Sequence, residues 1–248
     1  MEINVSHSKT SDEIGGLDEL RNLIKNSPIP ENEILENLGL YMPRQSLTRL
    51  IFMNDLYKMI LNINGVVMEF GTRWGQNLAL FNNFRAMYEP YNFTRKIIGF
   101  DTFEGFLNLD EKDGKSKIVG IGNYSVTKKY ENHLTTVLAA HEKLSPISHI
   151  KKASIEKGDA SKMLGEYLKN NQQTIVALAY FDMDLYKPTI DCLNLLKPYL
   201  VKGSIVAFDD LLDPEFPGET VALREAFDLS NIKLQRLSYN SYPAFIVI

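Results

Sequence analysis

Two pairs of acids stand at the ends of apolar segments, and their type and position suit cation chemistry. One pair closes the run "ALAYFDMD", and the other closes "SIVAFDD". The four residues are Asp182, Asp184, Asp209 and Asp210. The apolar runs predict buried parallel strands, whose carboxyl ends form the ligand-binding edge of an open α/β sheet. Carboxylates gathered at one edge repel one another unless a cation lies among them.

Three of these acids, Asp182, Asp209 and Asp210, are hard oxygen ligands of the kind that Mg²⁺ prefers, at about 2.0–2.1 Å. In an alternative that stays open, Asp209 caps a following helix and Asp210 is solvated. Zinc is not predicted, because Cys192 is the only cysteine and the four histidines lack ligand spacing. Asp182 and Asp184 are two residues apart on an extended chain, so both can point the same way. One can hold a cation while the other faces a substrate hydroxyl.

Other acids follow earlier strands. Glu69 lies near the end of the first expected strand, Asp101 ends the second and Asp159 follows the third. The turn "EFGTRWG" carries Gly71 and Gly75, and its N–H groups can hold an anion, although an ordinary strand-to-helix turn explains the spacing about as well. Asp101 stands where a ribose diol would be held. Asp159 either contacts an adenine amino group or caps the helix that follows.

Strands and helices alternate along most of the chain and must position these acids. The expected strands cover 65–71, 96–101, 150–159, 174–182 and 204–210, and the expected helices 73–88, 126–144, 161–170, 186–199 and 218–227. This alternation predicts a mostly parallel sheet covered on both faces. Two further strands, 233–238 and 243–248, are expected to follow each other without a helix and predict an antiparallel hairpin at one edge. The sheet is expected to have seven strands.

An amphipathic helix is expected at 44–63, before the first strand. It could pack on the sheet, cover the active site or join two subunits. We expect residues 1–43 to form a partly helical or flexible N-terminal extension and 44–248 to form the catalytic domain.

The composition narrows the class of protein. The 248 residues carry a net charge of −4 without a Lys/Arg cluster, which makes nucleic acid a poor candidate partner. A single cysteine suits a reducing cytoplasm. We expect no membrane partner, because no apolar run approaches the ~20 residues needed to cross a bilayer. The polar start of the chain lacks the apolar segment of a signal peptide.

Five separated motifs together resemble the macrocin O-methyltransferase family, most closely its calicheamicin-type sugar O-methyltransferase branch. They are "VVMEFGTRWGQNLA", "GFDTFEGF", "GNYSV", "ALAYFDMDLYKPT" and "SIVAFDDLLDPEFPGE", in order between about residues 41 and 248. The resemblance implies a Rossmann-like methyltransferase fold and an enzyme that uses S-adenosyl-L-methionine and Mg²⁺. Where many family members have Trp-Arg, this chain has Arg73-Trp74, so no family role is carried over to Arg73.

The resemblance also implies roles for individual residues. The cofactor-binding set is Glu69, Gly71, Thr72, Gly75, Asp101, Thr102, Phe103, Asp159, Ala160 and Asp182. The metal ligands are Asp182, Asp209 and Asp210, and Asp184 is the general base that removes a proton from the acceptor hydroxyl. Packing alone explains Phe103 equally well. The implied acceptor is a small sugar or glycoside with a vicinal diol, and the implied assembly is a homo-oligomer.

Three other functions remain open at this stage. "DMD" is also a D-x-D motif of metal-dependent glycosyltransferases, although such an enzyme would not need the Glu69–Gly75 turn. A catechol-type small-molecule O-methyltransferase fits as well, because vicinal phenols also chelate Mg²⁺. A non-catalytic module on the same fold is the third.

Overall fold

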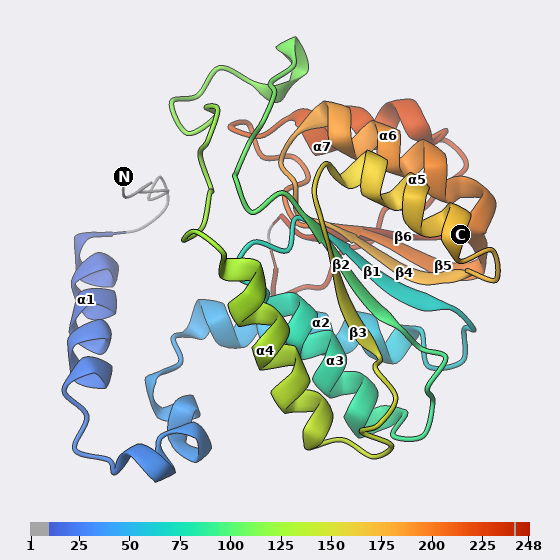
Figure 1. Ribbon diagram of the computed structural model, residues 1–248. Coiled ribbons are helices and arrows are strands. Elements are labelled where there is room, and N and C mark those ends of the chain that lie inside the picture. The colour runs from blue at the N-terminus through green and yellow to red at the C-terminus, as the bar shows by residue number, and fades with distance from the viewer. Residues whose placement is uncertain (1–9, 241) are drawn as a thin grey trace. The chain divides into compact units, whose positions relative to one another are not determined.

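The computed structural model describes residues 10–240 and 242–248 (Figure 1). The chain divides into two compact units, Met1–Ile51 and Phe52–Ile248. In the first unit, helix α1 (Ser11–Lys25) begins with a capping box between Thr10 and Glu13. Two short 3₁₀ segments follow, Glu31–Glu33 and Leu35–Tyr41. The boundary expected between residues 43 and 44 stays a prediction.

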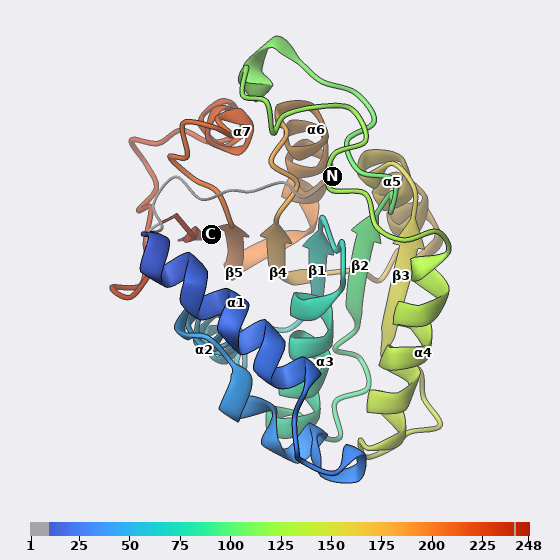
Figure 2. The same ribbon diagram turned by 90° about the vertical axis from the view of Figure 1, so that its left-hand side faces the viewer.

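The second unit is built on a sheet of six strands among the described residues, in the order β3-β2-β1-β4-β5-β6. Figure 2 shows β3, β2, β1, β4 and β5 side by side. The strands are β1 (Val66–Phe70), β2 (Ile97–Asp101), β3 (Ala153–Lys157), β4 (Val176–Phe181), β5 (Leu200–Phe208) and β6 (Ala244–Val247). All neighbours are parallel except β5 and β6, which are antiparallel. The sheet reverses its strand order at β1 and β4, and that reversal is where open α/β sheets bind ligands.

Helices cover both faces of this sheet. Figure 1 shows α5, α6 and α7 on one face and α3 and α4 on the other. Their bounds are α3 (Gln76–Tyr88), α4 (Tyr130–Lys143), α5 (Ala160–Asn170), α6 (Tyr186–Leu196) and α7 (Gly218–Ala226). Helix α2 (Arg44–Met59) crosses the boundary between the units, and its buried residues begin at Phe52. The expected parallel sheet with helices on both faces is confirmed.

A row of phenylalanines crosses the centre of the sheet. Phe100, Phe70, Phe181 and Phe208 lie in register on β2, β1, β4 and β5, with neighbouring ring centroids 4.9, 4.8 and 5.3 Å apart. All four are fully buried in the core cluster that α5, α6 and α7 cover. Each is the last apolar residue of its run, so the residues that follow them emerge together at the same edge of the sheet.

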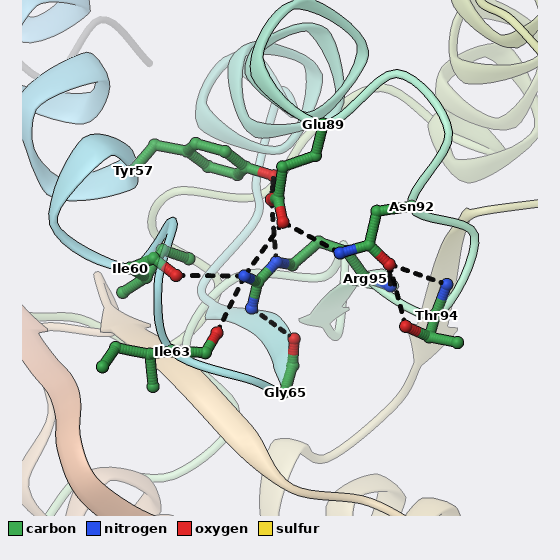
Figure 3. A network of polar contacts seen from close by, with 8 residues as sticks. All are labelled: Tyr57, Ile60, Ile63, Gly65, Glu89, Asn92, Thr94 and Arg95. Carbon is green, nitrogen blue, oxygen red and sulfur yellow. Dashed lines mark hydrogen bonds and ion pairs between the residues drawn. The ribbon is translucent and has the colours of Figure 1, made fainter.

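A buried ion pair lies before the amino ends of β1 and β2, away from the acids (Figure 3). The guanidinium of Arg95 lies 2.9 Å from the Glu89 carboxylate, which also accepts a hydrogen bond from the Tyr57 hydroxyl at 2.6 Å. The same guanidinium donates to three carbonyl oxygens in the segment between α2 and β1, those of Ile60, Ile63 and Gly65. One side chain thus bonds three backbone carbonyl groups of the segment that leads into β1.

The prediction of seven strands was wrong. Residues 233–238 form only an isolated bridge, Gln235 to Phe245, instead of a strand. The segment carries Lys233 and Arg236, and its Leu234 is 42% exposed, so it has little apolar surface to bury against the sheet. The antiparallel edge is instead the β5–β6 pair. The strand expected at 150–159 is β3, which lies at the other edge of the sheet. Among the described helices, none combines the length and the apolar content that a bilayer crossing requires.

Candidate active site

The register of the phenylalanine row decides where the acids lie. Asp101 and Gly71 follow Phe100 and Phe70, while Asp182 and Asp209 follow Phe181 and Phe208. Four neighbouring strands therefore present these residues at one edge, at the reversal of strand order.

Three carboxylates converge beyond β4 and β5. One oxygen each from Asp182, Asp184 and Asp210 lies within 4.8 Å of the other two, a grouping that could hold a metal ion. Asp184 is 8% exposed and has a backbone φ of +63°, a left-handed conformation that is uncommon outside glycine. Carboxylate oxygens grouped at this spacing suit a hard divalent cation such as Mg²⁺.

Asp209 makes a contact that sequence reasoning missed. The hydroxyl of Tyr180, on β4, donates a hydrogen bond to Asp209 Oδ1, and both side chains are buried. The alternating side chains of β4 place Tyr180 and Phe181 on opposite faces of the sheet. The expected ligand role of Asp209 stays a prediction, and the structure shows its carboxylate oriented by Tyr180.

The electrostatics of the acids favour a cation. Burial raises the pKa of Asp184 well above its usual range, and the neighbouring Asp182 carboxylate raises it further. Burial likewise raises the pKa of Asp210, with further contributions from Asp209 and Asp184. Like charges in a buried space each disfavour the ionised form of the other, and a divalent cation relieves that repulsion. The donor set therefore fits Mg²⁺ by ligand type, number and charge.

Glu219 is an acid whose role sequence reasoning missed. It is fully buried in the first turn of α7. One carboxylate oxygen accepts from the backbone N–H of Met183 at 2.9 Å and of Asp184 at 3.2 Å, and the other from Asp210 at 3.4 Å. In the sequence, an acid in the first turn of a helix is sufficiently explained by the helix dipole. Nothing in "GETVALREAF" distinguishes it from a solvent-exposed Glu.

The turn after β1 has a backbone conformation and a buried hydroxyl group that suit the binding of a small molecule. Gly71 has φ +90° and Gly75 has φ +79°, and a β-carbon on Gly75 would stand 2.3 Å from Leu134 of α4. Between them, Thr72 is buried, and its Oγ1 has no hydrogen-bond partner among the residues the structure describes. A buried hydroxyl without a hydrogen-bond partner in the protein can form one with a polar atom of a ligand. Glu69 is buried in β1, opposite Gly99 and Tyr180 of the flanking strands.

Asp101 joins this turn to the end of β2. Its carboxylate accepts hydrogen bonds from the backbone N–H groups of Arg73 at 2.7 Å and Phe103 at 2.5 Å. Burial raises the pKa of Asp101, and these two hydrogen bonds oppose that effect. Thr102 Oγ1 donates to the Gly105 carbonyl at 3.0 Å, which closes the turn. Phe103 is buried with a φ of +59°.

Asp159 caps helix α5. Its side chain accepts from the backbone N–H of Lys162 at 3.0 Å and from the Ser161 hydroxyl at 2.7 Å. The capping alternative is therefore realised, while an adenine contact by Asp159 stays a prediction. Ala160, the first residue of α5, is buried in the core.

An aromatic loop residue lies beside the acid group. Tyr124 packs on Phe106 and Phe216, and the Arg73 guanidinium lies 4.9 Å from the centre of its ring. Burial raises the pKa of Tyr124 to about 12, with Asp184 as the next largest cause, so its hydroxyl stays protonated. The loop 102–125 has no periodicity from which its path, and so the place of Tyr124, could be predicted.

Comparison with known proteins identifies related structures. No family model and no curated protein matches the chain. The chain is similar to the crystal structure of CalS11, a calicheamicin methyltransferase, with 40% sequence identity, a TM-score of 0.94, and coverage of 96% of this chain and 93% of that chain. It is also similar to the apo structure of CalS11, TDP-rhamnose 3'-O-methyltransferase, an enzyme in calicheamicin biosynthesis, at 39% identity and TM-score 0.85, covering 96% and 95%.

A more distant likeness shows the fold alone. The O-methyltransferase NovP is 16% identical, with a TM-score of 0.56 over 81% of this chain and 79% of that chain.

Proposed function

The chain belongs to the family of calicheamicin-type sugar O-methyltransferases and is an S-adenosylmethionine-dependent O-methyltransferase, and we propose that its acceptor is a sugar hydroxyl in a vicinal diol, methylated with the help of Mg²⁺. The observation that carries the proposal is the group of three carboxylate oxygens, from Asp182, Asp184 and Asp210, beside the Gly71 turn. It occurs in a chain 40% identical to CalS11 over nearly its full length.

The donor would be held by the turns after β1 and β2. Glu69 and the Gly71–Gly75 turn would lie at the amino-acid end of the donor, where Thr72 Oγ1 would supply a hydroxyl, and Asp101 would hold the ribose diol. Phe103, Asp159 and Ala160 would contact the adenine. S-adenosylmethionine supplies an electrophilic methyl group on a sulfonium, so the remaining task of the chain is to align a hydroxyl with it.

The acceptor would be held at the carboxylate group. Asp182, Asp209 and Asp210 hold the cation in this proposal, and Mg²⁺ bound there supplies positive charge that favours ionisation of a sugar hydroxyl and fixes its position. Asp184 removes the hydroxyl proton. Its oxygen lies within 4.8 Å of the Asp182 and Asp210 oxygens, so an acceptor bound at this group is within its reach.

The first acceptor to test is TDP-rhamnose, because CalS11 is a TDP-rhamnose 3'-O-methyltransferase. We expect calorimetric binding of S-adenosylhomocysteine and methyl transfer from S-adenosylmethionine that stops on chelation by EDTA and returns with added Mg²⁺. Catechol serves as the acceptor for the catechol-type alternative. Absence of S-adenosylhomocysteine binding would favour the glycosyltransferase, and full turnover in EDTA would remove the metal from the proposal.

Two further predictions concern assembly and location. We expect a homo-oligomer, which light scattering coupled to size-exclusion chromatography measures, and residence in the cytoplasm, which cell fractionation measures.

A further inference from the structure

The two segments that carry the grouped acids are joined by one side chain. Asp182 and Asp184 follow β4, and Asp210 follows β5. The strand pairing ends with Asp209 donating to the Phe181 carbonyl, so Asp184 and Asp210 lie beyond the last paired residues. Glu219 accepts from Met183 and Asp184 with one oxygen and from Asp210 with the other. Its carboxylate therefore bridges the backbone on both sides of the proposed cation site.

The approach of α7 that allows this bridge is built into the residue before Glu219. A β-carbon on Gly218 would stand 2.5 Å from the backbone nitrogen of Tyr186 and 2.6 Å from the Asp184 carbonyl oxygen. Any other residue at position 218 would push the first turn of α7 away from the segment after β4. On the other side, the Thr220 hydroxyl accepts from the backbone N–H of Leu212 at 2.9 Å. Three consecutive residues of α7 thus dock into both segments.

The bridge also accounts for the unusual backbone of Asp184. A non-glycine residue with φ near +60° costs roughly 1–3 kcal/mol and persists only where its surroundings hold it. Here the N–H of Asp184 is bonded to Glu219 and its carbonyl is in contact with Gly218. These contacts keep the Asp184 side chain near those of Asp182 and Asp210.

We propose that Glu219 is a positioning residue that holds the segments after β4 and β5 at the spacing a divalent cation requires. The inference rests on the proposed function, since it takes the cation site as its premise. Glu219 has no room to reach the acceptor itself, because it is fully buried. It acts by accepting backbone N–H groups, a task that requires two acceptor oxygens on one rigid carboxylate.

The test compares Glu219→Gln with Glu225→Gln, the same chemical change two turns further along α7. Glu225 is exposed and bonds to Lys112 and Tyr186 instead of the acid segments. In Glu219→Gln one acceptor oxygen becomes an amide NH₂ that faces backbone donors. Mn²⁺ serves as the probe, because carboxylate sites accept it in place of Mg²⁺. Its binding is measured by electron paramagnetic resonance of the free ion, and that of Mg²⁺ by competition.

We expect Glu219→Gln to bind Mn²⁺ and Mg²⁺ at least tenfold more weakly than the wild type, and Glu225→Gln to bind them equally well. S-adenosylhomocysteine binding should stay within twofold, since its turn lies on other strands, and raised Mg²⁺ should restore part of the lost turnover. A purely structural residue would instead lower the unfolding temperature and both affinities together, without rescue by Mg²⁺. Such a result would overturn the inference.

Glu219→Asp is the second variant, used if Glu219→Gln fails to fold. It keeps the charge but is one methylene shorter, so it cannot reach both segments, and the same weakening of Mn²⁺ binding is expected. If the wild type binds Mn²⁺ and a folded variant binds it equally well, the positioning role is wrong while the proposed function stands. If the wild type itself binds no Mn²⁺ or Mg²⁺, the cation site and the positioning role are both wrong.

Discussion

Gly71 lies directly against the carbonyl oxygen of Asp182, which would stand 1.8 Å from a β-carbon at position 71. The backbone N–H of Asp182 in turn donates to the Phe70 carbonyl at 2.8 Å. The turn that would hold the methyl donor and the first acid of the cation site are therefore in van der Waals contact through their backbones. This contact fixes the start of the turn against the residue that directly follows β4, while Asp184 and Asp210 lie further along their segments.

Gly71→Ala should disrupt both sites at once. The substitution meets a backbone oxygen that cannot move away and a φ of +90° that disfavours any side chain, so we expect a loss of more than about 3 kcal/mol in the free energy of unfolding. S-adenosylhomocysteine binding, measured by calorimetry, should be lost. Gly165→Ala is the control: position 165 lies within α5 with open space around it, so a neutral or slightly stabilising change is expected. Equal behaviour of the two variants would contradict the close contact.

Asp101→Asn should weaken cofactor binding without preventing folding. The charged oxygens that would bond the ribose are replaced by a neutral amide, and hydrogen bonds to charged groups contribute about 1.5–3 kcal/mol. We therefore expect affinity for S-adenosylhomocysteine to fall at least tenfold. Asp228→Asn, an exposed acid that bonds only local Ser230 and Asn231 groups, is the matched control. Unchanged affinity in Asp101→Asn would remove Asp101 from the donor site.

Asp184→Asn should separate binding from chemistry. The amide keeps the size of the carboxylate but cannot take the hydroxyl proton, so turnover should fall by about 10²–10⁴-fold. Binding of S-adenosylhomocysteine and of Mn²⁺ should be retained. Asp210→Asn is the comparison: it should weaken Mn²⁺ binding as well as turnover. Wild-type turnover in Asp184→Asn would contradict the base role, and loss of Mn²⁺ binding in that variant would make Asp184 a ligand instead.

Arg95→Met should destabilise the edge of the sheet that lies away from the acids (Figure 3). It removes the cation that pairs with the Glu89 carboxylate and the guanidinium donor to three backbone carbonyls, and breaking a buried pair in this way costs about 3–5 kcal/mol. Urea unfolding at pH 7 measures the change. Lys187→Met, which breaks the exposed pair with Asp191, should be indistinguishable from wild type. A loss of similar size in both variants would argue against the role of the buried network.

The same network predicts a dependence on pH. Burial alone would raise the pKa of Glu89, but hydrogen bonds from Arg95, Tyr57 and Asn92 outweigh it and hold the pKa below its usual range. A depressed folded-state pKa means that the stabilisation is present above the unfolded value of about 4.3 and is lost as the pH falls through the folded value. The stability difference between wild type and Glu89→Gln should therefore shrink when the pH is lowered from 7 to below 4. A difference that grows instead would contradict this sign.

The secondary structure was largely predictable because its determinants are local. The apolar runs at 65–71, 96–101 and 174–182 became β1, β2 and β4, and the expected helix at 218–227 became α7. The failure at 233–238 has the same origin. A short segment forms a strand only if a neighbour pairs with it along its length, and within 233–238 Gln235 alone is paired.

The sequence by itself determined that acids follow the carboxyl ends of several parallel strands. The alternation of apolar strands and helices that predicts this arrangement depends only on the local order of residues. Only the tertiary structure decided which acids meet. Strand order and register bring Asp182 and Asp184 to Asp210 and aim Tyr180 at Asp209. Glu219 was invisible for the same reason: its backbone partners are up to 36 positions away along the chain, and only the packing of α7 against both segments brings them within hydrogen-bond distance. Contacts of this kind depend on distances between elements, which the local pattern of residues does not encode.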